Sequence, residues 1–78
     1  MVTVRYFASA RAAAGTAEES LDVPTLAALR KELVARGEGL ARVVDVASFL
    51  VDGQAWREPD AALPASCTVD VLPPFAGG

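Results

Sequence analysis

The sequence predicts an α+β fold, in which a mixed sheet of about five strands packs one face against one main helix. Short segments with alternating apolar and polar residues occur on both sides of a single helical pattern, and those on the C-terminal side include a hairpin. The 78 residues suffice for only one domain. We therefore expect a single domain over residues 1–72, followed by an extended, flexible tail over residues 73–78.

The first strand is expected at residues 2–7, where successive side chains point to opposite faces. Its inward face carries three large residues, Val2, Val4 and Tyr6. The other face carries Phe7 with Arg5. An aromatic residue on a solvated sheet face marks either a covered edge of the sheet or a docking contact, and the sequence leaves both open.

A short helix and a second strand are expected to follow. Ser9 can cap the alanine-rich residues 10–14, and Gly15 can provide a left-handed stop. Residues 17–23 end in apolar and polar alternation, which predicts a strand paired with the first.

The main helix is expected after Pro24, with Thr25 as its N-cap and Gly37 at its end. Three leucines recur at helical spacing and should face the core: Leu26, Leu29 and Leu33. Residues 40–44 predict a second, short helical turn.

The last strands are predicted at residues 46–51, 54–56 and 68–72. In the last of them the alternation turns Val69 and Val71 inward and leaves Asp70 on the other face. Asp52-Gly53 is typical of the two-residue turn that joins a hairpin. Trp56 is either a core residue or an interface anchor, and its place in a short edge strand favours the interface.

The tail carries the features that suggest chemistry. Pro73-Pro74 fixes the backbone and ends the last strand, and six residues of about 3.3 Å each could project about 20 Å. Gly77-Gly78 lacks Cβ atoms and can enter a narrow channel. We expect a free carboxylate on Gly78, which is a poor electrophile until ATP or a similar donor activates it, and therefore a substrate for another protein's enzyme. A frayed chain end is the alternative.

Composition excludes several classes of site. One cysteine and no histidine exclude an internal disulfide, the common zinc, haem and copper ligand sets, and a Ser-His or Cys-His pair. Cys67 is expected to be a small structural residue. Glu18 and Glu19 should lie on opposite strand faces, as solvated charges rather than as a catalytic pair.

Charge and hydropathy constrain partners and compartment. A net charge of −3 without a basic run argues against nucleic acid and membrane partners. The sequence has neither a long apolar run nor the pattern of a signal peptide, so we expect a cytoplasmic protein.

Taken together, these motifs resemble the ubiquitin-like (β-grasp) sulfur carriers of the MoaD and ThiS type, most closely the small subunits of molybdopterin synthase. The tail is the most specific part of the match. The matching residues are Val4, Tyr6, Phe7, Ala8, Arg11, Gly15, Pro24, Thr25, Leu26, Leu29, Leu33, Val51, Asp52, Gly53 and Leu72 to Gly78.

The resemblance implies a non-catalytic carrier that binds no cofactor itself. A ubiquitin-activating-type enzyme would use ATP to adenylate Gly78, and a sulfurtransferase would supply sulfur for a thiocarboxylate. The carrier would then dock on the large subunit of molybdopterin synthase, in a heterotetramer, and donate sulfur to cyclic pyranopterin monophosphate.

Carried over by position, Gly78 is the reacting residue and Gly77 its thin neighbour. The expected partner contacts are Phe7, Arg11, Trp56, Pro73, Pro74, Phe75 and Ala76. The chain departs from the family at Ala65-Ser66-Cys67, where Asp-Gly-Asp is common, and at Trp56, which is bulkier than usual.

Three other functions stay open. The chain could carry sulfur for another pathway, such as cysteine or another sulfur metabolite. It could instead be a ubiquitin-like modifier joined through Gly78 to lysines of other proteins, or a binding module whose tail has no covalent role.

Overall fold

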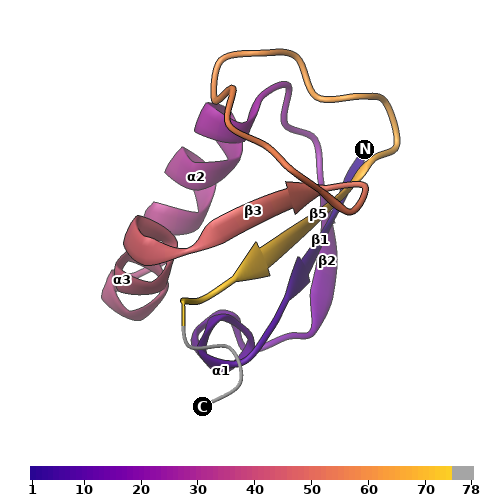
Figure 1. Ribbon diagram of the computed structural model, residues 1–78. Helices are drawn as coiled ribbons and strands as arrows, with labels where there is room; N and C mark the ends of the chain where they lie inside the picture. The colour runs from indigo at the N-terminus through magenta and orange to yellow at the C-terminus, as the bar shows by residue number, and fades with distance from the viewer. Residues whose placement is uncertain (75–78) are drawn as a thin grey trace.

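The computed structural model describes residues 1–74, which form three helices and a mixed five-stranded sheet (Figure 1). The fold prediction is confirmed, while the predictions for Phe75, Ala76, Gly77 and Gly78 lie outside the described residues. In chain order the elements are β1 (Val2–Tyr6), α1 (Ser9–Ala14), β2 (Glu18–Leu21), α2 (Leu26–Val34), α3 (Glu38–Val46), β3 (Ser48–Val51), β4 (Gln54–Ala55) and β5 (Thr68–Leu72).

The sheet has the strand order β2-β1-β5-β3-β4. β1 and β5 run parallel, whereas β2 is antiparallel to β1, and β3 is antiparallel to both β5 and β4. The predicted hairpin turn at Asp52-Gly53 joins β3 to β4, and both turn residues have the positive φ that its type requires, 49° and 84°. The last strand of the chain is therefore the central strand of the sheet.

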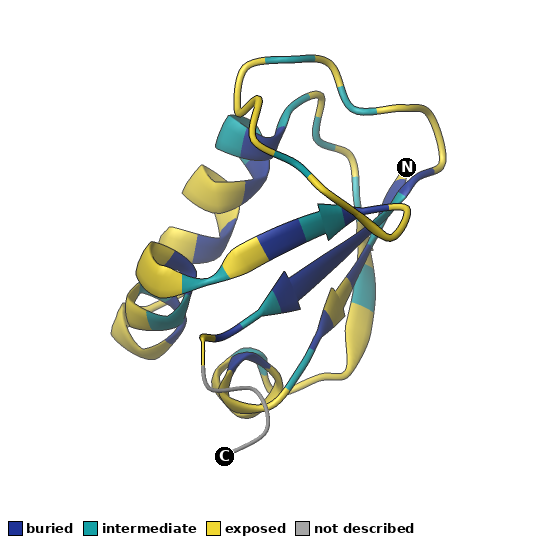
Figure 2. Cartoon of the chain, in the orientation of Figure 1, coloured by how far each residue is buried: buried dark blue, intermediate teal, exposed yellow. Residues whose placement is uncertain are grey.

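The core lies between the sheet and helices α2 and α3 (Figure 2). The predicted inward residues of β1 and β5 are buried, as are the three leucines of α2. Cys67, just before β5, is only 1% exposed. Alternation in strands and three-to-four-residue spacing in helices thus predicted most of the core.

Helix α3 corrects the predicted arrangement of residues 40–51. It is a nine-residue helix rather than a short turn, it packs against both α1 and α2, and it buries Leu40 and Val44 in the core. Val46 was assigned to a strand, but it is the last residue of α3 and is 58% exposed. The β-branched valines of this segment favour a strand locally, and helix packing overrides that preference. The fold therefore has two nine-residue helices instead of one main helix.

The predicted caps give one success and one error. Thr25 caps α2, because its Oγ1 accepts a hydrogen bond from the Ala28 N–H at 3.1 Å. Ser9 does not cap α1: it is the first helical residue, Ala8 occupies the cap position, and no side chain bonds there. Gly15 ends α1 in the left-handed conformation, as predicted.

Glu19 is not the simple solvated charge that the sequence suggested. Its Oε2 accepts a hydrogen bond from the buried Tyr6 hydroxyl at 2.7 Å and also pairs with the Arg36 guanidinium, just after α2. The hydrogen bond from Arg36 is the main cause that lowers the pKa of Glu19. Glu19 therefore ties β1, β2 and the end of α2 together, while its neighbour Glu18 is exposed.

The two candidate caps can be compared directly. We expect Thr25→Ala to lower the free energy of unfolding by about 1 kcal/mol, because one backbone N–H of α2 loses its acceptor. Ser9→Ala should change it by less than about 0.5 kcal/mol. Urea unfolding followed by circular dichroism measures both, and equal losses would refute the assignment of caps.

Glu19 should also make stability depend on pH. The pKa of Glu19 in the folded protein lies below the ordinary value of 4.5. The stability that its charged form contributes is therefore complete above pH 4.5 and is lost as the pH falls through the folded pKa. We expect Glu19→Gln to reduce the loss of unfolding free energy in acid, because the variant side chain has no carboxylate to protonate. Indistinguishable pH profiles of the wild type and Glu19→Gln would contradict the network.

Candidate functional site

The candidate site is the end of the sheet from which the tail departs. Because β1 and β5 are parallel, the residues that follow them emerge at the same end, where the Phe7 N–H donates to the Val71 carbonyl at 3.3 Å. Pro73 is buried and Pro74 is exposed. These two prolines are called the tail root below.

An ion pair occupies the sheet face that α2 and α3 leave uncovered. Arg5 and Asp70 are register partners on β1 and β5, and two hydrogen bonds join them: Nε to Oδ1 at 2.6 Å and Nη2 to Oδ2 at 3.0 Å. The Asp70 side chain is 9% exposed and that of Arg5 49%. The hydrogen bond to Asp70 raises the pKa of Arg5, which therefore keeps its charge on this face.

Phe7 and Arg11 lie beside this ion pair. The Arg5 guanidinium lies 5.5 Å from the centroid of the half-buried Phe7 ring. A shallow hollow of about 240 Å³ is lined by Arg5, Phe7, Arg11 and Glu18, among others. The structure therefore brings two predicted contact residues, Phe7 and Arg11, to one surface that offers an aromatic ring and two guanidinium groups. Such a surface suits a partner with apolar and acidic groups.

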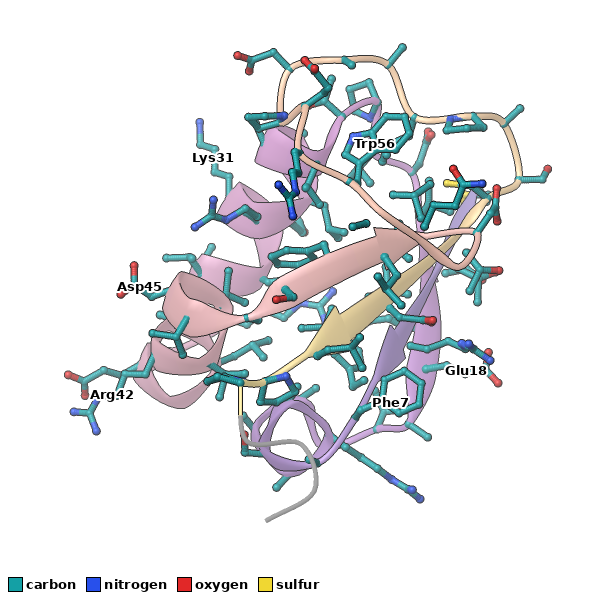
Figure 3. The ribbon with its side chains drawn as sticks, in the orientation of Figure 1. Phe7, Glu18, Lys31, Arg42, Asp45 and Trp56 are labelled. Atoms are coloured by element: carbon teal, nitrogen blue, oxygen red, sulfur yellow. The ribbon has the colours of Figure 1, made fainter. Side chains whose placement is uncertain are left out.

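Trp56 lies at the opposite end of the molecule from Phe7 (Figure 3). Its backbone N–H donates to the Phe49 carbonyl at 3.1 Å, and its indole N–H donates to the Glu58 carbonyl at 2.9 Å. The half-buried ring also packs against the core. The structure does not bring Trp56 together with the tail root, and its role as a partner contact stays a prediction.

The remaining chemistry is predicted for residues that the structure does not describe. Gly78 is the predicted reacting residue, with Gly77 as its thin neighbour, and Phe75 and Ala76 are predicted partner contacts. Within residues 1–74, no group of three or more Cys, Asp or Glu side chains is placed to hold a metal ion. In the same residues, no helix has the length and apolar character needed to cross a membrane.

Sequence reasoning missed the partnership of Arg5 with Asp70. Both residues were placed outward by alternation, but their pairing depends on the parallel register of two strands that are 65 positions apart in sequence. One signal in the sequence could have indicated a partner. The strand at residues 68–72 contains a single charged residue, an aspartate, and a buried aspartate needs a partner.

Comparison with known proteins gives a consistent family. The model of the ThiS family matches residues 4–78. No match was found among curated proteins. Among solved structures, the putative molybdopterin converting factor subunit 1 from Pyrococcus furiosus is 29% identical, with a TM-score of 0.81 over 95% of this chain and 97% of that one.

Two further solved structures share the fold. The small archaeal modifier protein 1 from Methanosarcina acetivorans is 26% identical, with a TM-score of 0.82 over 99% of this chain and 95% of that one. A chain in the complex of subunits 1 and 2 of the molybdopterin-converting factor from Helicobacter pylori is 23% identical, with a TM-score of 0.76 over 99% and 97%. The family match spans nearly the whole chain, and the sheet and helices agree with it, so the protein belongs to the ThiS family of ubiquitin-like carriers.

Proposed function

We propose that the protein is a sulfur carrier for molybdopterin synthesis, acting as the small subunit of molybdopterin synthase. Family membership over residues 4–78 is the observation that carries the proposal. The similarity to a putative molybdopterin converting factor subunit 1 from Pyrococcus furiosus supports this choice of pathway. The reacting group in this proposal is the carboxylate of Gly78.

The proposed chemistry proceeds in three steps. The Gly78 carboxylate attacks the α-phosphorus of ATP in an activating enzyme, which forms an acyl-adenylate and releases pyrophosphate. The outer sulfur of a sulfurtransferase persulfide then attacks the acyl carbon and displaces AMP, which forms an acyl disulfide. A thiol reduces this acyl disulfide, is itself oxidised to a disulfide with the sulfurtransferase cysteine, and releases a thiocarboxylate, which is a nucleophile and a sulfur donor. The carrier contributes a thin, reachable terminus, while ATP binding and acid–base catalysis belong to its partners. The carrier itself binds no cofactor in this proposal and acts in the cytoplasm.

The position of the tail root indicates which surface of the carrier a partner would contact. A partner that takes Gly77 and Gly78 into a narrow channel must approach the exposed Pro74, at the end of the sheet where the surface that carries Phe7 and Arg11 also lies. The Helicobacter pylori structure is a complex of two subunits, which supports a protein partner here. Phe75 and Ala76 would line the channel entrance. A contact at Trp56 requires a partner that also extends to the far end of the domain.

A second candidate function is protein modification. The similarity to small archaeal modifier protein 1 favours it, because a modifier would use the same activated Gly78 carboxylate to acylate lysine amines of other proteins. Stable adducts of higher mass would appear in cell extracts. A carrier for a different sulfur-containing product would instead load sulfur normally and fail only in complementing molybdopterin synthesis.

Sulfur loading tests the central step. After incubation with ATP, the host's adenylating enzyme and a sulfur donor, we expect replacement of oxygen by sulfur in the peptide that contains Gly78. Mass spectrometry of that peptide is needed, because oxidation of Met1 or Cys67 adds nearly the same mass. One alanine appended after Gly78 should abolish loading and leave thermal unfolding unchanged. Loading of the extended chain would overturn the mechanism.

Docking can be tested separately from loading. We expect Phe7→Ala to weaken binding to the activating enzyme or the large subunit by about 1–3 kcal/mol, roughly 5- to 150-fold, as for an aromatic anchor. Val34→Ala is the matched control, because this exposed apolar residue lies on α2, outside the surface around Phe7. Calorimetric titration measures both affinities, and equal affinities would remove Phe7 from the interface.

A further inference from the structure

A groove adjoins the tail root on the side of α3. It has a volume of about 370 Å³ and lies between the start of α1, the end of α3 and the end of β5. Val46 is the most exposed large aliphatic residue among residues 2–74, at 58%, and it lines this groove. The lining residues are Ala8, Ser9, Arg42, Val43, Val46, Pro73 and Pro74.

We propose that this groove binds the side chain of Phe75 of the same chain when no partner protein holds the tail. The proposal concerns the isolated protein and does not depend on the reaction proposed for Gly78. It adds an interaction surface between the tail root and α3, with a defined occupant.

Chain length restricts which residue can occupy the groove. Pro74 forms part of its wall, and consecutive Cα atoms are about 3.8 Å apart, so the groove is within reach of the next residue in the chain, Phe75. After Pro74, Phe75 is the only residue with a large apolar side chain, because alanine and two glycines follow it. A groove formed by the tail root thus adjoins the one aromatic side chain that the tail carries.

Size and chemistry also match an aromatic ring. A cavity of about 150 Å³ with an apolar lining is sufficient to bind benzene, and this groove is larger. Two prolines and two valines line it, and the aliphatic part of Arg42 can cover an edge while its guanidinium remains in water. Placing the Phe75 ring there would remove the methyl groups of Val46 from solvent.

Val34 shows why exposure of a valine alone is not enough. It is 47% exposed on α2, and it lines a different hollow, bordered by Arg30, Glu38 and Asp45. That hollow has charged walls and is not lined by Pro73 or Pro74. Val34 is therefore a matched control for Val46.

Binding of Phe75 in the groove would compete with partner docking. A partner that contacts Phe75 must first release it from the groove, so groove binding would lower the affinity of the partner. Variants that empty the groove should then bind the partner at least as tightly as the wild type, unless they also remove a partner contact.

The direct test is nuclear magnetic resonance of the full chain, labelled on valine methyl groups. We expect nuclear Overhauser contacts between the Phe75 ring and the methyl groups of Val43 and Val46. Phe75→Ala should shift these methyl signals and leave those of Val34 unchanged. Val46→Ser should weaken the contacts of the ring with Val43, whereas Val34→Ser should preserve them. Both valines are exposed, so neither variant should unfold the domain.

Two results would overturn the proposal. If the ring makes no contacts with the groove, and if Phe75→Ala leaves the methyl shifts unchanged, the groove does not bind Phe75. Contacts that disappear on dilution, or that join a labelled chain to an unlabelled one, would assign the groove to the tail of a second copy. Sulfur loading is measured separately, so neither result bears on the proposed function.

Discussion

The parallel pairing of β1 with β5 is the constraint on which the rest of the structure depends. It joins the first strand of the domain to the last, with Val4 and Val69 as buried register partners. Parallel neighbours send the following residues out at the same end of a sheet, so Ala8 and Pro73 line one groove although 65 positions separate them in sequence. A β5 paired only at an edge would place the tail far from β1 and α1. The central position of β5 therefore determines which surfaces surround the tail root.

The ion pair between Arg5 and Asp70 illustrates how the uncovered sheet face is organised. A carboxylate in the middle of a central strand is costly without a partner, and Arg5 satisfies both of its oxygens. The charge of Arg5 is then held close to the Phe7 ring. The result is a fixed arrangement of charge and aromatic surface beside the tail root, whereas a solvated arginine at this position would sample many orientations.

Local patterns predicted the parts of the fold that depend on local chemistry. The leucine spacing of α2, the Thr25 cap and the turn at Asp52-Gly53 each follow from a few neighbouring residues. The helical turn predicted at residues 40–44 is shorter than α3, because the valines of this segment favour strands in isolation. The partners of Glu19 and Asp70, and the groove at the tail root, depend on the register of distant strands and on helix packing, which no local window contains. Ser66 is another example: it adopts a φ of 58°, in the left-handed region where the family pattern often has glycine.

The burial of Cys67 has a practical consequence for sulfur chemistry in this protein. Cys67 is the only cysteine, its side chain is enclosed before β5, and burial raises the pKa of its thiol. Thiol-reactive reagents attack the thiolate, so the folded chain should react with them slowly. Cys67 of the native protein should therefore add little to the labelling by an alkylating reagent. Such a reagent could reveal any other reactive sulfur atom that the chain acquires. Denaturation would remove this distinction by exposing Cys67.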